Sequence, residues 1–314
     1  MTQLNRAILL LCGFVVGGVI ASSAIAQEAE FKSRQVTPSG EYTFGIEGPA
    51  VDDAGNLYVV NFGKPGTIGK LAAGASQSEL FAVLPEGSVG NAIRFDRDGR
   101  MFVADYKKHN IFLISPDGKD VTTYFHSDDF NQPNDMTIAT DGTIYASDPH
   151  WKRHDGQIWR VSKSADGSVA GERMTADRRM STTNGIDLSP DGKTLYVGES
   201  DTREIWSYRI DGSHLLSSRL VKRFDDFDID GLRTDTDGNL LVARIRKGTI
   251  AVLSPQGKLK REIALNAKEP TNLAFGGNDG RTVFVTLRQG GFVESFRTDY
   301  PGREACFHGC AGRK

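Results

Sequence analysis

Six polar side chains that carry oxygen recur along the sequence, each eight residues before the glycine of a turn that leads into an apolar run. They are Glu47, Asn91, Asn134, Asn184, Asp230 and Asn272. Carboxylate and amide oxygens are the ligands that hard divalent cations such as Ca²⁺ prefer, and two carboxylates would balance one such ion. The six positions offer no thiolate or imidazole, which argues against a structural zinc site. If they do not converge in space, they are turn formers that bond the local backbone.

The polar positions belong to a repeat whose period indicates the fold. The turn glycines are Gly55, Gly99, Gly142, Gly192, Gly238 and Gly280, so successive repeats are 42 to 50 residues apart. Each glycine precedes a short run of β-forming residues, from LYVV at 57–60 to VFVT at 283–286. Glycine accepts positive φ without steric cost, so Asp-Gly and similar pairs favour tight hairpins. A period of about 40 to 50 residues is typical of a four-stranded propeller blade. We predict an all-β fold, a single six-bladed β-propeller over residues 27–300.

A propeller would bring the six polar positions together. The first strand of each blade lines the central channel, so residues at the same distance from the following turn lie at similar heights around the axis. We therefore expect a ring of polar side chains in the channel. The last repeat lacks a fourth strand, and residues 30–43 are unassigned. We expect this N-terminal stretch to complete the sixth blade and close the ring.

The two ends of the chain carry separate signals. Residues 1–26 combine a polar start, an apolar stretch and the sequence Ala24-Ile25-Ala26, which is the layout of a secretory signal with its cleavage site. This predicts an exported protein, periplasmic or secreted, without a stable membrane anchor; an uncleaved N-terminal anchor is the alternative. Residues 301–314 form a C-terminal tail, in which export would permit a disulfide between Cys306 and Cys310.

Composition narrows the classes of partner and of enzyme. Of 314 residues, 39% are hydrophobic and 25% are charged, and the formal net charge of −2 comes without a long basic or acidic run. Nucleic acid is therefore not an expected partner. The sequence has no G-x-S-x-G nucleophile elbow and no P-loop, which argues against an α/β serine hydrolase and against a nucleotide-binding enzyme.

Several segments resemble the gluconolactonase and SMP-30/regucalcin-like lactonases, a family related more distantly to paraoxonases and diisopropyl-fluorophosphatase. The resemblance extends from about Glu41 to Thr298. It rests on IEGP at 46–49, PND at 133–135, TNGIDLSPDGKTLYV at 183–197, DGLRTDTDGNLLVA at 230–243 and PTNLAFGG at 270–277. It implies a six-bladed propeller with one divalent cation on the axis, held by Glu47, Asn134, Asn184 and Asp230. Ca²⁺ fits these oxygen ligands best, with Zn²⁺, Mg²⁺ and Mn²⁺ as alternatives.

The same resemblance implies hydrolysis of a small-molecule lactone or a related ester. A bound cation would polarise the substrate carbonyl and lower the pKa of a bound water. Asp230, as a ligand beside that water, is the candidate general base, and a nucleophilic role for its carboxylate stays open. The rival interpretation is a non-catalytic propeller of the NHL type, which binds a ligand or a protein and holds a structural ion in its channel.

Four further positions are candidates for substrate binding: Asn91 and Asn272 of the ring, together with Gln132 and His150. Sugar-lactone members similar to regucalcin carry an arginine two residues before the first metal-binding Asn, where this chain has Gln132. The resemblance therefore leaves the substrate open. His150 lies in a segment, residues 148–155, that we expect to overhang the channel, where aromatic and imidazole groups could bind substrate or relay protons.

Overall fold

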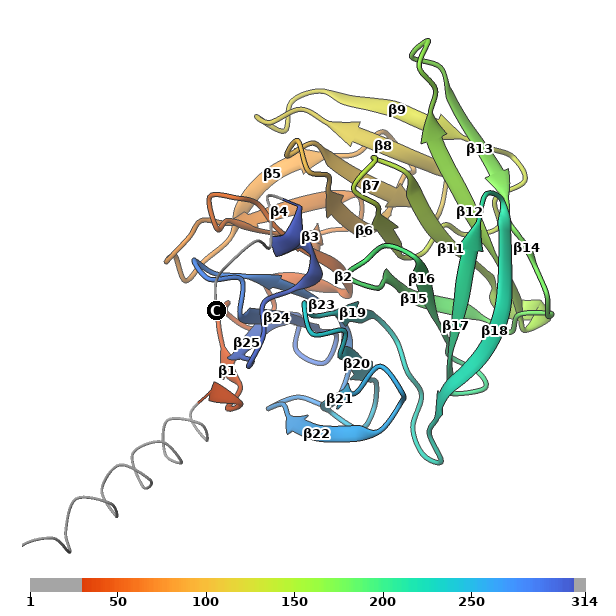
Figure 1. Cartoon of the computed structure of the whole chain (residues 1–314). Coiled ribbons are helices and arrows are strands. Elements are labelled where there is room, and N and C mark those ends of the chain that lie inside the picture. The colour runs from red at the N-terminus through yellow and green to blue at the C-terminus, as the bar shows by residue number, and fades with distance from the viewer. Residues whose placement is uncertain (1–29, 308–314) are drawn as a thin grey trace, which may run out of the picture.

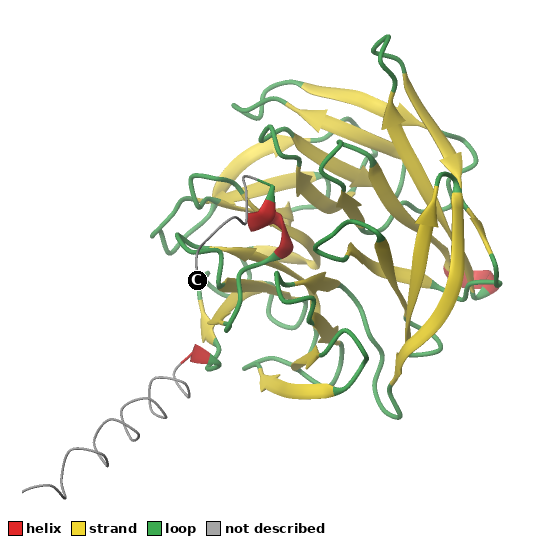
Figure 2. Cartoon of the chain, in the orientation of Figure 1, coloured by secondary structure: helices red, strands yellow, loops and turns green. Residues whose placement is uncertain are grey.

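The computed structural model describes residues 30–307, which form six sheets arranged around a central axis (Figure 1). Strands and their connecting loops make up nearly all of this part of the chain, which confirms the predicted all-β propeller (Figure 2). None of its helices has the length and apolar character needed to cross a membrane. The predicted signal segment, residues 1–26, and Cys310 of the predicted disulfide lie outside the described residues.

Each blade is a sheet of four strands, ordered outward from the axis. Blade 1 consists of β2 (Tyr42–Val51), β3 (Leu57–Phe62), β4 (Thr67–Leu71) and β5 (Glu79–Val83), and blade 2 of β6 (Gly90–Phe95), β7 (Met101–Asp105), β8 (Asn110–Ile114) and β9 (Val121–His126). Blade 3 consists of β10 (Met136–Ile138), β11 (Ile144–His150), β12 (Asp155–Lys163) and β13 (Val169–Arg173), with the short helix η1 (Trp151–Arg153) between β11 and β12.

The second half of the ring repeats this order. Blade 4 consists of β15 (Thr183–Leu188), β16 (Thr194–Glu199), β17 (Glu204–Asp211) and β18 (His214–Arg223), with the two-residue strand β14 (Thr175–Ala176) added in parallel at its outer edge. Blade 5 consists of β19 (Leu232–Thr234), β20 (Leu240–Arg244), β21 (Thr249–Leu253) and β22 (Leu259–Ala264). Blade 6 consists of β23 (Pro270–Gly276), β24 (Thr282–Leu287), β25 (Phe292–Arg297) and β1 (Arg34–Gln35).

The sixth blade is closed by the start of the chain, as predicted. Strand β1 pairs antiparallel with β25, with Arg34 opposite Ser295 and Gln35 opposite Glu294. The backbone N–H of Val36 continues the pairing by donating to the carbonyl of Val293 at 2.8 Å. Segments from the two ends of the described chain therefore share one sheet, and the ring closes through hydrogen bonds of the backbone.

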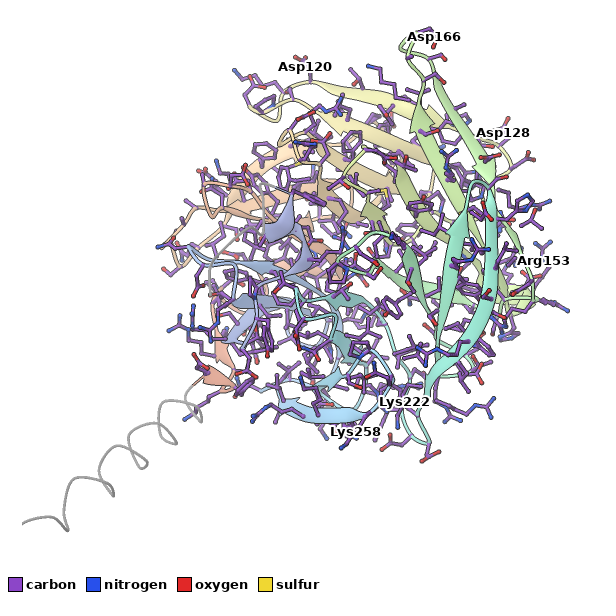
Figure 3. The ribbon with its side chains drawn as sticks, in the orientation of Figure 1. Asp120, Asp128, Arg153, Asp166, Lys222 and Lys258 are labelled. Atoms are coloured by element: carbon purple, nitrogen blue, oxygen red, sulfur yellow. The ribbon has the colours of Figure 1, made fainter. Side chains whose placement is uncertain are left out.

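Packing between neighbouring blades explains which strands are buried. All six residues of β15, the innermost strand of blade 4, are buried, because this strand has a blade on either side. In β22, the outermost strand of blade 5, Ile263 is the one buried residue of six. Charged side chains such as Lys222 and Lys258 lie at the periphery of the ring (Figure 3). The six turn glycines all have positive φ, between 70° and 84°, as the repeat requires.

The segment after the last blade, which the sequence places in a C-terminal tail, returns to the channel. In the short helix η2 (Arg303–Cys306), the Arg303 side chain is 5% exposed and donates to Asp187 at 3.0 Å and to Thr137 at 2.7 Å. These partners lie three residues further along the first strands of blades 4 and 3 than Asn184 and Asn134. Arg303 therefore enters the channel at the end where the turns lie, opposite the predicted cation site.

Replacing Arg303 with alanine should destabilise the propeller, because the Asp187 carboxylate would lose the cation that matches it. We expect the free energy of unfolding to fall by about 3 kcal/mol, the cost of breaking a buried ion pair. Arg246→Ala is the control, since that arginine is 60% exposed and pairs with Asp228 at the surface. The control should lose less than about 1 kcal/mol. Urea unfolding measures both values, and equal losses would contradict the structural role given to Arg303.

Candidate functional site

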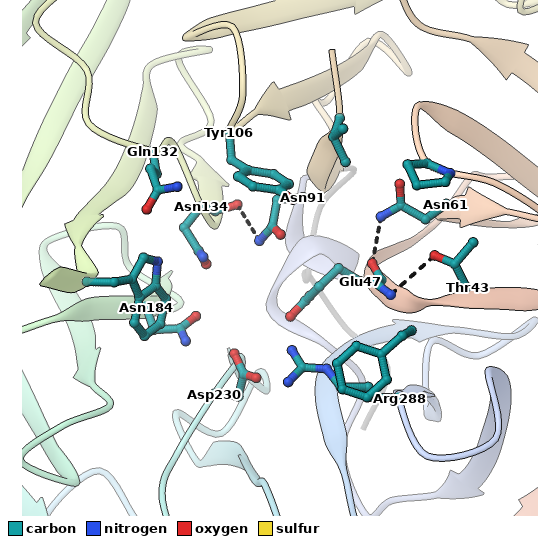
Figure 4. A pocket seen from close by; sticks show the side chains of 15 residues that line it. Thr43, Glu47, Asn61, Asn91, Tyr106, Gln132, Asn134, Asn184, Asp230 and Arg288 are labelled. Atoms are coloured by element: carbon teal, nitrogen blue, oxygen red, sulfur yellow. Dashed lines mark hydrogen bonds between the residues drawn. The ribbon is translucent and has the colours of Figure 1, made fainter. Parts of the chain in front are cut away.

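A pocket of about 460 Å³ opens at the end of the channel where the first strands begin (Figure 4). Five of the six ring positions line this pocket: Glu47, Asn91, Asn134, Asn184 and Asp230. The predicted substrate-binding residue Gln132 also lines it, as do Phe44, Tyr106, Trp151 and Arg288. Five residues that share one position in the sequence repeat therefore meet in one pocket, and each comes from a different blade.

The ring positions coincide with irregularities in the first strands. The pairing of β2 with β3 shifts register on either side of Glu47, and the pairing of β6 with β7 shifts at Asn91. The same shift occurs around Asn184 in blade 4 and around Asn272 in blade 6. A bulge of this kind inserts an unpaired residue and changes the direction of its side chain. Four of the six ring side chains are therefore released from regular strand pairing, while Asn134 and Asp230 lie just before β10 and β19.

Asn184 presents an acceptor to the pocket that no protein donor satisfies. Its amide Nδ2 donates to Ser200 Oγ at 3.0 Å, and that hydroxyl donates to the carbonyl of Ile229 at 2.8 Å. These bonds fix the orientation of the amide. Its Oδ1 is buried without a hydrogen-bond partner among the described residues. A buried carbonyl oxygen left in this way is costly unless something outside the chain binds it.

Two carboxylates line the same pocket as Asn184, and both are buried. Glu47 and Asp230 are each 6% exposed. Burial raises the pKa of both groups, to about 7 for Asp230, and the charge of Asp230 raises the pKa of Glu47 further. The positive charge of Arg288 opposes the shift at both carboxylates. Two like charges out of water need a positive partner, so the pair fits a divalent cation.

The donor set is of the oxygen type. Between residues 30 and 307, no group of three or more His, Cys, Asp or Glu side chains is placed to hold a metal. A cation in the pocket would therefore rely on amide oxygens as well as on the two carboxylates. The side chains that could supply them are Asn134 and Asn184, which line the pocket with Glu47 and Asp230 (Figure 4). This chemistry suits Ca²⁺ and other hard cations.

A further buried carboxylate, which no ring position marks, lies beneath the pocket at the level called the floor here. Asp135 is fully buried and accepts hydrogen bonds from Arg94 and from both Nη atoms of Arg233, the latter at 2.9 and 3.0 Å. It also accepts from Asn272 Nδ2 at 3.3 Å. Asn272 is therefore engaged beneath the pocket and does not line it, contrary to the place expected for a substrate-binding residue. Asp135 directly follows Asn134, in the segment PND.

The wall that carries Gln132 is held in place by a second buried carboxylate. Asp148, at 0% exposure, accepts from the backbone N–H groups of Asn131 and Gln132, the latter at 2.6 Å. Its Oδ2 also accepts from Gln157 Nε2 at 2.6 Å. Because the segment that includes Gln132 leads directly into Asn134, Asp148 positions both residues.

His150 does not reach the pocket. Its Nδ1 accepts from the backbone N–H of Arg153 at 3.2 Å and caps η1. The next residue, Trp151, is 39% exposed and lines the pocket, so the segment does overhang the site, through its indole. Arg288 and Tyr106 also line the pocket, and neither occupies one of the six ring positions. The two buried arginines of the floor could have been found in the sequence, because Arg94 and Arg233 each stand three residues after a ring position.

The buried carboxylates should make the stability of the metal-free protein depend on pH. Burial raises the pKa of Asp230 to about 7, above the value of about 4 for an unfolded aspartate. A group of this kind stabilises the fold below its unfolded pKa, and the contribution is lost as the pH rises through its folded pKa. Between about pH 5 and about pH 8, this loss should be about 3 kcal/mol.

Asp230→Asn removes this titration, so the metal-free variant should lose less stability than the metal-free wild type over the same interval. Urea unfolding in the presence of a chelator, at both pH values, gives the difference between the two proteins. The same pH dependence in both proteins would show that Asp230 does not titrate in this range.

Comparison with known proteins gives the family of this chain. A sequence model of the SMP-30/Gluconolactonase/LRE-like region matches residues 45–289. The chain is 29% identical to a gluconolactonase of Zymomonas mobilis over 217 residues, which is 62% of this chain and 60% of that protein. It is 26% identical to the diisopropyl-fluorophosphatase of Loligo vulgaris, over 83% of this chain and 91% of that protein. The same fold occurs in the crystal structure of a calcium-binding protein, regucalcin, from Agrobacterium tumefaciens, with a TM-score of 0.67. That match has 18% identity and covers 86% of this chain and 97% of that chain. The chain belongs to the SMP-30/gluconolactonase/LRE-like family.

Proposed function

We propose that this protein is a divalent-cation-dependent hydrolase that acts on a lactone or a related ester. The observation that carries the proposal is that the unsatisfied Oδ1 of Asn184 belongs to a side chain of the same pocket as the buried carboxylates of Glu47 and Asp230. An oxygen acceptor and two negative charges in one pocket are costly without a cation and favourable with one. Membership of a family whose relatives include a gluconolactonase supports the lactone as the substrate class.

Four residues would hold the cation: Glu47, Asn134, Asn184 and Asp230, with Ca²⁺ as the ion that their oxygens favour. The bound ion would polarise the substrate carbonyl and lower the pKa of a bound water. Ser200 keeps the Asn184 amide turned toward the pocket, and Arg94 and Arg233 offset the charge of Asp135 beneath the ion. Outer hydrogen bonds of this kind commonly set how well a metal site binds.

Asp230 would act as the general base. Its carboxylate lines the pocket, where it could accept a proton from a water bound to the same cation. As water attacks the carbonyl, Asp230 takes its proton, and the same proton is returned to the ring oxygen when the lactone C–O bond breaks. Asn91 and Gln132 line the pocket and would bind substrate hydroxyl or carbonyl groups.

The direct test is hydrolysis of a panel of lactones, carboxylic esters and phosphotriesters before and after removal of metal. We expect chelation to abolish turnover and one of Ca²⁺, Mg²⁺, Mn²⁺ or Zn²⁺ to restore it. Asp230→Asn should lower kcat/KM at least about 100-fold at saturating cation, because a base is lost. The matched control is Asp96→Asn, the same change at a buried aspartate whose side chain bonds Asp98 and Arg100 in the turn of blade 2.

Two outcomes would reject the proposal. The first is full activity of Asp230→Asn or of the chelated protein on the best substrate. The second is a cation that raises the unfolding temperature while no lactone, ester or phosphotriester is hydrolysed, which would identify a structural ion in a binding propeller.

Export stays a prediction of the sequence. We propose that residues 1–26 direct the protein out of the cytoplasm, so that the hydrolysis takes place in the periplasm or outside the cell.

A further inference from the structure

Arg288 directs a guanidinium into the pocket without a fixed partner. It follows β24, where its backbone N–H donates to the carbonyl of Glu269 at 2.9 Å and its carbonyl accepts from Gly291 at 3.3 Å. Its backbone is therefore anchored, while its side chain extends toward Asp230 and Glu47 (Figure 4). The guanidinium carbon lies 5.0 Å from the centre of the Phe44 ring, and Nε is buried without a hydrogen-bond partner among the described residues.

The other arginines of the channel are engaged differently. Arg94 and Arg233 share Asp135, and Arg303 pairs with Asp187. Across residues 30–307, Arg288 forms no such ion pair with a carboxylate and donates no side-chain hydrogen bond. Its contact with Phe44 is a cation–π interaction, which leaves the donors of the guanidinium edge available. A guanidinium in a partly enclosed pocket is suited to bind a planar or tetrahedral anion through several of these donors.

The balance of charge in the pocket points the same way. A divalent cation would offset the charges of Glu47 and Asp230, and the two arginines of the floor more than offset Asp135. The charge of Arg288 would then be unmatched at the wall of the pocket. On the opposite wall, Gln132 offers a neutral amide (Figure 4). A pocket with one free positive charge on one wall and a neutral wall facing it favours an anionic ligand over its neutral analogue.

We propose that Arg288 is a specificity-determining residue that binds an anionic group of the substrate, so that the preferred substrate is a lactone bearing a carboxylate, sulfonate or phosphate. This inference rests on the proposed lactone hydrolysis and adds the class of substrate. The reading it competes with is that Arg288 serves only to offset Glu47 and Asp230, in which case its loss would affect charged and neutral lactones alike.

The test compares substrates that differ by one charged group. The γ-lactones of gluconic and glucaric acid share a ring and a chain length, and the second carries a carboxylate in place of a hydroxymethyl group. A phosphorylated gluconolactone beside its unphosphorylated parent tests the phosphate. At saturating cation, we expect wild type to favour the charged member of at least one pair. Arg288→Gln should reduce that preference, expressed as a ratio of kcat/KM values, about 10- to 100-fold, mainly through KM.

The matched control is Arg261→Gln. Arg261 also stacks on an aromatic ring, with its guanidinium carbon 3.7 Å from the centre of Phe31, but it is exposed on β22 and does not line the pocket. This variant should keep the wild-type ratio. Arg288→Lys, which keeps the charge but loses the planar donors, should retain part of the preference.

A binding measurement makes the inference independent of turnover. Calorimetry of the cation-loaded protein with glucarate, gluconate and phosphogluconate should show that wild type binds glucarate or phosphogluconate more tightly than gluconate, with the difference lost in Arg288→Gln. An unchanged ratio in Arg288→Gln, or a wild type that binds and hydrolyses charged and neutral members equally, would overturn the inference. In those cases hydrolysis of neutral lactones would still support the proposed function. If no lactone, ester or phosphotriester is hydrolysed but the Arg288-dependent binding is found, the proposed function fails and the anion site stands.

Discussion

Charges that converge on the axis of a closed propeller must be matched there, because burial between the blades removes these side chains from bulk water. The matching occurs in layers. At the end where the turns lie, Asp187 is matched by Arg303. In the middle, Asp135 lies between Arg94 and Arg233. In the uppermost layer, Glu47 and Asp230 have no ion-pair partner within the described chain, and a layer left incomplete in this way is where a ligand is expected.

Closure of the ring fixes the relative positions of the residues in this incomplete layer. The four proposed cation ligands come from blades 1, 3, 4 and 5, so their mutual distances depend on how the blades are held together. Pairing of β1 with β25 closes the ring at its periphery, and Arg303 joins blades 3 and 4 at the axis. The backbone N–H of Thr236 donates to the carbonyl of Pro301 at 2.9 Å, which joins blade 5 to the same C-terminal segment as Arg303. Strand β1 and the segment 301–303, which lie before and after the six repeats in the sequence, thus help to hold in place a site that neither of them touches.

The sequence predicted the parts of the molecule that repeat. A fixed distance to a turn glycine is a local property, so the blades, the closing strand and the convergence of five ring residues could all be predicted from spacing. The sixth position, Asn272, failed to reach the pocket because its amide bonds Asp135, a contact between blades that no spacing reveals. His150 failed for a local reason, since it caps a helical turn. Arg303 lies after the last repeat, and Arg288 stands where other blades have a tyrosine or a serine, so only the folded structure could show the roles of these two arginines.

The central claim is that the incomplete layer binds one cation through Glu47, Asn134, Asn184 and Asp230. Diffraction from crystals grown with Ca²⁺, collected at a wavelength where calcium scatters anomalously, tests it most directly. The account predicts a single strong peak in the channel, with the four side-chain oxygens at about 2.3–2.6 Å and Asn184 Oδ1 among them. A channel without a peak, or a peak whose ligands exclude Asn184 Oδ1 or either carboxylate, would contradict it.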